Sequence, residues 1–237
     1  MDRHGPDHCG SADKCRLLST QSLRDPRVWD ELLRQMNVEN YSGWQPAITG
    51  TVVGMLSPGR GTVFAVSCDR SHRFSKPHAF SVRLIEGHGI EGDAHAGAFI
   101  KHRYLARQDA QIPNNRQVHL IQSELFKELR AVGFDVGPGQ LGENITTKGI
   151  DLLTLPLGAR LRLGPAAVVE LTGLRTPCGY IDKFQKGLKR AMIVRTPAGV
   201  TFRAGVLGVV RASGDVSPGD SIQAEAWPAH TPRLPAI

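Results

Sequence analysis

The hydrophobic positions of this chain occur mostly in short runs, which are separated by polar segments rich in glycine. Short runs that are β-branched, or that alternate apolar with polar residues, are typical of β-strands. We expect strands over residues 49–56, 61–66, 81–85, 117–121, 191–194, 200–202, 205–210 and 221–223. Most consecutive strands lack room between them for a crossover helix, so parallel βαβ winding is not expected. The pattern therefore predicts a mainly β domain, and the succession of strands suggests a barrel.

Helical periodicity is much rarer in the chain than strand periodicity. Apolar residues recur at helical spacing over residues 25–37 and again over 124–132. Ser123 is placed to cap the second of these helices and Gly133 to end it. Residues 183–190 predict a loop or a short helix. The fold class that follows is a mainly β barrel with one or two short helices and an N-terminal extension.

The same patterns divide the chain into three parts. Residues 1–47 form an N-terminal extension, which begins with a polar stretch and contains the amphipathic segment. Residues 48–225 hold all the predicted strands and form the main domain. Residues 226–237 form a proline-containing C-terminal tail that we expect to be frayed.

Composition and charge narrow the class of protein. Hydrophobic residues make up 41% of the 237 residues and charged residues 22%, which favours a packed core and excludes global disorder. The formal net charge of +7 attracts anions such as nucleic acid, anionic lipid or a phosphorylated small molecule. Aromatic and basic residues do not interleave, so the hypothesis of a nucleic-acid binder is supported by the net charge alone. No signal peptide or membrane-spanning run is visible, and we expect a cytoplasmic protein without a membrane partner.

Four cysteines are present: Cys9, Cys15, Cys68 and Cys178. Their spacing gives neither a disulfide framework nor a strong metal site. Cys178 has a distinctive setting, because an apolar run leads into it and Arg175 precedes it by three residues. A nearby guanidinium favours the reactive thiolate. The alternative is a small buried residue at the end of a strand, and local context leaves both interpretations open.

Two glycine-rich loops, 87–97 and 137–146, concentrate further polar residues. The first carries Asp93 and His95, and the second carries Glu143. Glycine-rich backbone can bring amides close to an anion, and carboxylate with imidazole can serve acid–base or metal roles. The first loop does not end in the Gly-Lys-Ser/Thr sequence of a phosphate loop. Simple turns, with Asp93 acting as a cap, are the alternative.

Four motifs then occur in a fixed order along the chain. They are Gly89-Ile-Glu-Gly-Asp-Ala-His-Ala-Gly97, Arg116-Gln-Val-His-Leu-Ile121, Gly142-Glu-Asn-Ile-Thr-Thr147 and Thr172-Gly-Leu-Arg-Thr-Pro-Cys178. Each motif is weak alone, but the ordered set closely resembles the MOSC domain, which is named after the C-terminal domain of molybdenum cofactor sulfurases. The similarity runs from about Thr49 to Gln223.

This resemblance implies a distorted β-barrel with a site for a molybdenum cofactor, in which Cys178 is the metal ligand or the sulfur-handling residue. Stand-alone members that resemble this chain include reductases of N-hydroxylated compounds such as hydroxylaminopurines. The chain lacks the pyridoxal-phosphate desulfurase domain of the larger sulfurases, and it has no iron–sulfur motif. A separate electron-donor protein is therefore expected beside a small N-hydroxylated substrate. A homodimer is one of the alternatives for the oligomeric state.

The resemblance also suggests roles for individual residues. The candidates for binding the cofactor phosphate are Arg103, Arg116, Arg175 and Lys183, since basic side chains match phosphate oxygens. The candidates for contacting the pterin or orienting the loops are Glu143, Asn144 and Thr172. Asp93 and His95 are candidates for moving protons during N–O reduction. The leading hypothesis is a molybdenum oxidoreductase with Cys178 on the metal, and the alternative is a sulfur carrier that holds a persulfide on Cys178.

Overall fold

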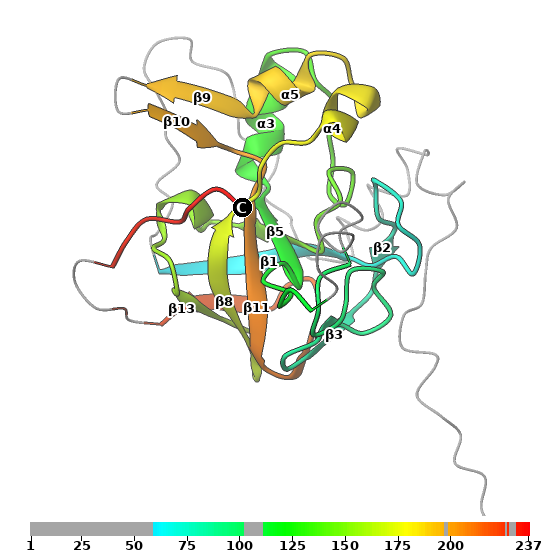
Figure 1. The fold of residues 1–237 in the computed structure, drawn as a ribbon, viewed down its shortest axis with the longest axis vertical. Coiled ribbons are helices and arrows are strands. Elements are labelled where there is room, and N and C mark those ends of the chain that lie inside the picture. Colours follow the sequence, from blue (N-terminus) through cyan, green and yellow to red (C-terminus); the bar gives the residue numbers. More distant parts are fainter. Residues whose placement is uncertain (1–58, 102–110, 197–198, 226, 228–230) are drawn as a thin grey trace, which may run out of the picture.

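The computed structural model describes residues 59–101, 111–196, 199–225, 227 and 231–237 (Figure 1). Several predictions lie outside these residues: the N-terminal extension over 1–47 with its helix over 25–37, the strand over 49–56, and the role of Arg103 in binding phosphate.

Seven strands form a closed barrel. They are β1 (Arg60–Ser67), β5 (Val118–Gln122), β6 (Ile145–Lys148), β7 (Arg160–Leu163), β8 (Ala167–Leu174), β11 (Val206–Ala212) and β13 (Ser221–Ala224). Their spatial order is β13-β7-β8-β11-β5-β6-β1, and β1 pairs back onto β13 to close the ring. A two-residue strand, β2 (His78–Ala79), extends the sheet beside β1. The predicted mainly β barrel is confirmed. Predicted strands overlap β1, β5, β11 and β13, and β8 coincides with the apolar run that leads into Cys178.

The barrel is antiparallel throughout except at one neighbouring pair. β5 and β6 run parallel, and helix α3 (Glu124–Ala131) lies between them in the sequence. The 123–144 connection is long enough for a crossover. The expectation that βαβ winding is absent therefore fails at this one place.

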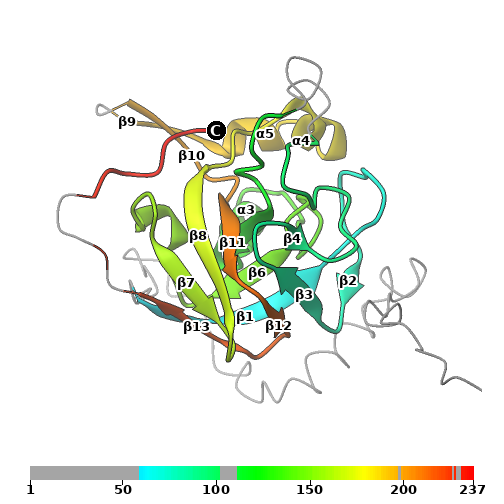
Figure 2. The same ribbon diagram turned by 60° about the horizontal axis from the view of Figure 1, so that its bottom comes forward.

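Smaller elements lie around the barrel. A three-stranded sheet is formed by β3 (Val82–Ile85), β4 (Gly89–Ile90) and β12 (Gly214–Val216), and it lies on one side of the barrel (Figure 2). The remaining elements are η2 (Leu152–Thr154), α4 (Gly179–Phe184), α5 (Leu188–Ala191) and the hairpin of β9 (Ile193–Thr196) with β10 (Gly199–Phe202). The segment predicted as a loop or one short helix thus forms two. No helix among the described residues is both long and hydrophobic enough to cross a bilayer.

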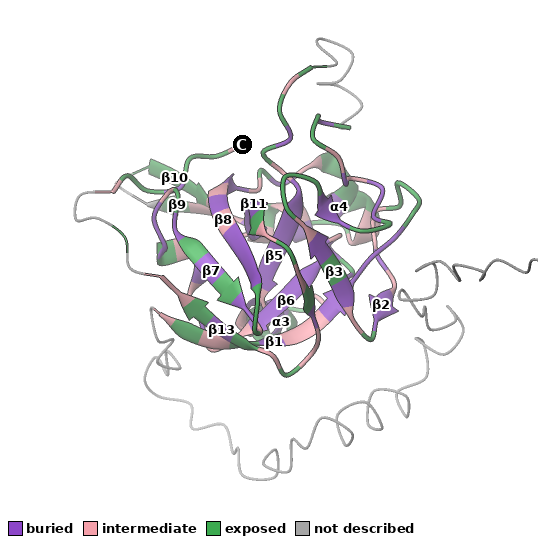
Figure 3. Cartoon of the chain, turned by 90° about the horizontal axis from the view of Figure 1, so that it is seen from below, coloured by how far each residue is buried: buried purple, intermediate pink, exposed green. Residues whose placement is uncertain are grey.

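Two hydrophobic clusters form the core (Figure 3). The larger fills the barrel with inward-facing side chains such as Leu120 and Leu171. The smaller lies beneath the helices and includes Leu129 of α3 and Ile181 of α4. Because β-strand side chains alternate between faces, β7 buries every second residue.

The C-terminal residues 231–237 are ordered against the barrel, so the expectation of a frayed tail is wrong. Leu234 is buried in the larger core cluster. Ala236 bridges in parallel to Leu174 at the end of β8, and the Ile237 N–H donates to the Leu174 carbonyl at 3.0 Å. Burial of one leucine and these backbone bonds fix the segment beside the loop that leads to Cys178.

Candidate functional site

Cys178 lies at the point where the chain leaves the barrel and enters the helical layer. It precedes α4 directly, in an extended backbone conformation, and its half-buried side chain packs against the smaller core cluster. The loop before it is held by backbone hydrogen bonds from Arg175 N–H to the Gly205 carbonyl at 2.9 Å and from Thr176 N–H to the Ile237 carbonyl at 3.2 Å. The thiol is therefore presented from a fixed backbone.

Arg175 supplies positive charge next to this thiol. Burial lowers the pKa of its guanidinium, while Cys178 and Glu143 raise it through their negative charge. The Arg175 Nη1 is shielded from solvent and makes no hydrogen bond within the described residues. Buried donors normally have a partner, so an unpaired guanidinium nitrogen marks a position suited to an anionic acceptor.

Arg116 adds a second cation. It is half-buried, and desolvation lowers its pKa. Its charge also lowers the pKa of Arg175, which places the two guanidinium groups in one electrostatic environment. Residues before Arg116 are tied to β8, because the Thr172 hydroxyl donates to the Asn115 carbonyl at 2.6 Å. Thr172 thus positions the loop that carries Arg116.

Glu143 is completely buried and holds the second glycine-rich loop in shape. Its carboxylate accepts hydrogen bonds from the Gly139 N–H at 2.5 Å, the Leu141 N–H at 3.2 Å and the Thr146 hydroxyl at 3.2 Å. Burial raises its pKa, and these donors oppose that shift. The carboxylate oxygens are thus used within the protein, and the charge of Glu143 raises the pKa of Arg175.

Asn144 connects three segments through its side-chain amide. Its Nδ2 donates to the Ser67 carbonyl at 3.2 Å and to Asp93 Oδ2 at 2.9 Å, while its Oδ1 accepts from the His119 N–H at 3.2 Å. The amide therefore joins the end of β1, strand β5 and the first glycine-rich loop.

Asp93 is the centre of the neighbouring polar network. Its Oδ2 lies 2.7 Å from Lys76 Nζ, and its Oδ1 accepts from the His95 N–H at 2.9 Å and contacts His95 Nδ1 at 3.2 Å. Burial raises the pKa of this carboxyl, but the bonds from His95 and the charge of Lys76 outweigh it and hold the pKa well below its usual range. Asp93 is therefore an ionised anchor, and the imidazole of His95, whose side chain is 44% exposed, is the group within reach of solvent.

Two buried residues of this region were missed by the sequence analysis as members of the site. Lys76 lies in a polar loop with no distinguishing pattern. His119 stands among apolar residues of a predicted strand, which is a detectable signal of a buried polar group. Its Nε2 contacts the Ala204 carbonyl at 2.7 Å. Burial, together with the charges of Arg175 and Lys76, lowers its pKa well below the ordinary value, so the network around Asp93 adjoins the arginines beside Cys178.

Aromatic side chains flank Cys178 on the helical side. Phe74 stacks on Tyr180 with ring centroids 6.4 Å apart and also contacts Phe184 at 5.8 Å. Tyr180 is 57% exposed, and Lys183 Nζ lies 5.1 Å from its ring centroid. Lys183 is thus on the outer surface of α4.

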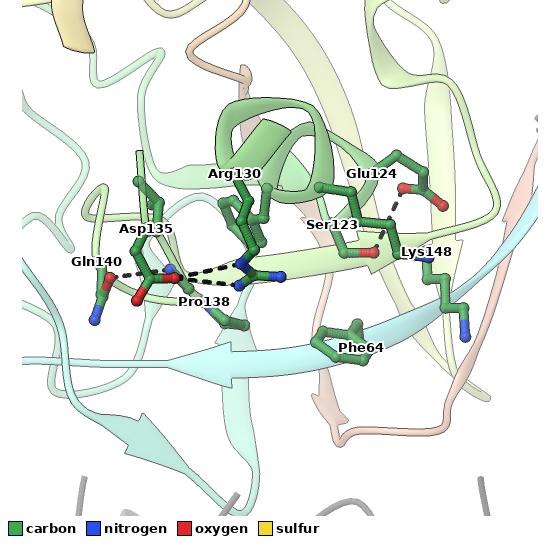
Figure 4. Close-up of a pocket in the computed structure, with 12 residues that line it drawn as sticks. Phe64, Ser123, Glu124, Arg130, Asp135, Pro138, Gln140 and Lys148 are labelled. Carbon is green, nitrogen blue, oxygen red and sulfur yellow. Dashed lines mark hydrogen bonds and ion pairs between the residues drawn. The ribbon is translucent and has the colours of Figure 1, made fainter. Parts of the chain in front are cut away.

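A pocket of about 430 Å³ lies elsewhere, between α3, β1 and the loop after α3 (Figure 4). Phe64 and Phe126 line it, and Arg130 forms an ion pair with Asp135 at its edge. It contains none of the predicted site residues. Within the described residues, no three His, Cys, Asp or Glu side chains are grouped as a metal site.

The fold and this arrangement define a class: a closed β-barrel domain with Cys178 and Arg175 after β8, and with Arg116, from the segment before β5, in the electrostatic environment of Arg175. The sequence model of the MOSC domain matches residues 93–223, more than half of the chain. The chain therefore belongs to the MOSC domain family, and the resemblance seen in its motifs is confirmed.

Solved structures agree on the fold. The YuaD protein of Bacillus subtilis matches with a TM-score of 0.59 and 22% identity, over 71% of this chain and 97% of its own. YiiM of Escherichia coli matches with a TM-score of 0.51 and 18% identity, over 73% of each chain. YiiM of Geobacillus stearothermophilus matches with a TM-score of 0.52 and 16% identity, over 73% of this chain and 79% of its own. No curated protein sequence gives a significant match.

Proposed function

We propose that this protein is a molybdenum-cofactor oxidoreductase that removes oxygen from small N-hydroxylated compounds, with Cys178 as the protein ligand of the metal. The family is associated with molybdenum cofactor-related proteins. The observation that carries the proposal is the Cys178 thiol beside Arg175, whose Nη1 is buried without a partner.

The donor set fits such a cofactor. A thiolate is a soft ligand that suits molybdenum, by extension of the softness argument for transition metals. Because no group of three metal-ligating side chains lies in the described residues, the cofactor itself would supply the other ligands. Its phosphate would be bound by Arg175 and Arg116, with Arg103 and Lys183 as further candidates.

When bound, the cofactor supplies two-electron chemistry at its metal. The protein's own part is to hold the groups around it. Arg175 places a positive charge beside Cys178, and Glu143 and Asn144 keep the two glycine-rich loops in place. In the reaction the N–O bond breaks, two electrons and two protons are consumed, and amine and water leave. His95, with Asp93 at its Nδ1, donates a proton to the departing oxygen.

Metal and pterin analysis tests the proposal directly. The full chain is expressed in a host that makes the cofactor, and the wild type is expected to carry both molybdenum and pterin. Cys178→Ala should lose the metal, whereas Cys68→Ala, which removes a thiol from the end of β1, should keep it. Full molybdenum retention in Cys178→Ala would remove the ligand role.

A sulfur carrier is the second candidate, because Cys178 is half-exposed and its thiol can also hold a persulfide. Mass spectrometry separates the two functions. A sulfur adduct on Cys178 in protein that contains no molybdenum, after purification from the same host, would favour the carrier.

A further inference from the structure

The positive charge of this protein is concentrated in one segment. Residues 179–203, which form α4, α5 and the β9–β10 hairpin, contain six lysines and arginines and one carboxylate, Asp182. Their net charge is +5, compared with +7 for the whole chain. We call five of these cations the cationic face: Lys183, Lys186, Lys189, Arg190 and Arg195.

The cations of this face are not neutralised by the part of the protein that the structure describes. Within the described residues, none of the five has a carboxylate within ion-pair distance, and the sixth cation, Arg203, pairs with Glu128. Several arginines elsewhere on the surface are paired, such as Arg83 with Asp215 and Arg162 with Glu225. Uncompensated like charges destabilise a compact state, while they attract partners of the opposite sign. The distribution therefore favours an acidic partner.

The cationic face also adjoins the candidate site. α4 begins immediately after Cys178, and α4, α5 and the hairpin lie together beyond the end of β8 (Figure 1). Two exposed hydrophobic residues belong to the same segment: Tyr180 is 57% exposed to solvent and Val200 is 54% exposed. Apolar contacts with charged residues around them are typical of protein–protein interfaces.

We propose that the cationic face docks an acidic electron-carrier protein. This inference rests on the proposed function, because it supplies that reaction with its reductant. Reduced iron–sulfur or flavin groups of the carrier give up two electrons in total, and the carrier becomes oxidised. Two protons enter from solvent, the substrate N–O bond breaks, and water leaves. Complementary charge raises the rate of encounter and orients the carrier toward the Cys178 side of the molecule.

A protein fits this face better than a nucleic acid. Proteins that bind single strands combine a basic groove with several aromatic platforms, and Tyr180 is the one exposed aromatic ring among the described residues of this segment. Asp182 also lies among the cations, where it would repel a phosphate backbone but can pair with a lysine of a mixed protein surface.

Binding and turnover of the cofactor-loaded full chain test the proposal. The probe is an acidic plant-type [2Fe–2S] ferredoxin, with binding measured by calorimetry at low salt. Lys186→Glu and Arg190→Glu, made singly, are each expected to weaken binding about tenfold and to lower ferredoxin-driven turnover in parallel. Turnover driven by a reduced viologen should stay unchanged. The matched control is Arg60→Glu, which makes the same charge change on exposed β1 residue 60 and should leave ferredoxin binding intact.

Three outcomes would overturn the proposal: no ferredoxin binding by the wild type at low salt, equal binding by Lys186→Glu and Arg60→Glu, or tighter binding of a single-stranded oligonucleotide than of ferredoxin. Failure of the proposed function is distinguishable, because it abolishes viologen-driven turnover while calorimetry still reports docking.

Discussion

Lys76 Nζ lies 2.7 Å from Asp93 Oδ2, and the two side chains are only 4% and 1% exposed. This buried ion pair joins the polar loop after β1 to the first glycine-rich loop, and Asn144 donates to the same Asp93 oxygen at 2.9 Å. Two charges removed from water stabilise one another only while both are present and hydrogen-bonded. The pair is therefore a point where the loops around the site depend on each other.

Lys76→Met should strongly destabilise the protein, because it leaves the Asp93 carboxylate buried without its cation. We expect a loss of about 3–5 kcal/mol in the free energy of unfolding, measured by urea denaturation. The double variant Lys76→Met/Asp93→Asn should recover part of that loss, since it buries no net charge. A double variant as unstable as the single one would show that packing of the lysine stem, and not its charge, matters at this position.

Stability should fall as the pH is lowered from 7 to 4, because of His78. Burial lowers the pKa of this imidazole to about 4, whereas in the unfolded chain it is about 6.5. The unfolded state therefore binds the proton first, and stability is lost between these pH values, by about 3 kcal/mol for a shift of this size. Asp93 contributes separately, because its depressed pKa affects stability only below about pH 3.9.

Chemical denaturation at several pH values checks this dependence. His78→Gln removes the titrating group, so its unfolding free energy should change less between pH 7 and pH 4 than that of the wild type. If the unfolding free energy of His78→Gln changes with pH as much as that of the wild type, another group, such as the buried His119, causes the pH dependence.

The barrel could be predicted from the sequence because its strands carry local signals. β8 and β11 are eight and seven residues long and rich in valine, and the inward positions of β7 alternate with outward ones. β2, β4 and β12 are two or three residues long, which is too short for any period to be detected. The parallel pairing of β5 with β6 was missed because it depends on where a long connection crosses, which hydrophobic patterns do not encode.

The candidate site was less predictable than the barrel. Cys178 and Arg175 are close in sequence, so their proximity follows from the local chain. Lys76 and Asp93 are 17 residues apart in the sequence, with β2, β3 and β4 between them, and no periodicity links the two. The ordered C-terminal segment was missed for a similar reason, because one leucine in a proline-rich stretch gives no pattern, yet Leu234 is buried.

Gly173→Ala should displace the C-terminal segment from β8. An added Cβ would come within 2.7 Å of Ile237 Cγ1 and 2.8 Å of the Pro235 carbonyl oxygen, which is closer than real contacts allow. We expect a loss of about 1–3 kcal/mol in stability from this overpacking. Hydrogen exchange should show faster exchange of the amides of Leu174 and Thr176, which donate to the segment. Unchanged exchange at both amides would show that Gly173 is not needed to hold the C-terminal segment against β8.

Arg175→Met should reduce retention of the pterin and its molybdenum. The substitution removes the guanidinium whose Nη1 lacks a partner. The methionine side chain is similar in volume to that of arginine, so packing is largely preserved. A charge-assisted hydrogen bond is worth about 1.5–3 kcal/mol, so affinity should fall by at least about tenfold. The retained pterin is measured by its fluorescence after the protein is denatured, and the retained molybdenum by metal analysis. Arg211→Met, which removes an arginine paired with Glu170 on β8, is the control and should retain the cofactor fully.

His95→Gln should lower turnover without lowering the cofactor content. The imidazole is half-exposed, and its Nδ1 lies 3.2 Å from the Asp93 carboxylate, which orients the ring and favours a proton on that nitrogen. Loss of a positioned acid typically costs about 10²–10⁴ in rate, and the fall should appear in kcat. A His95→Gln variant with wild-type kcat would remove this residue from proton transfer.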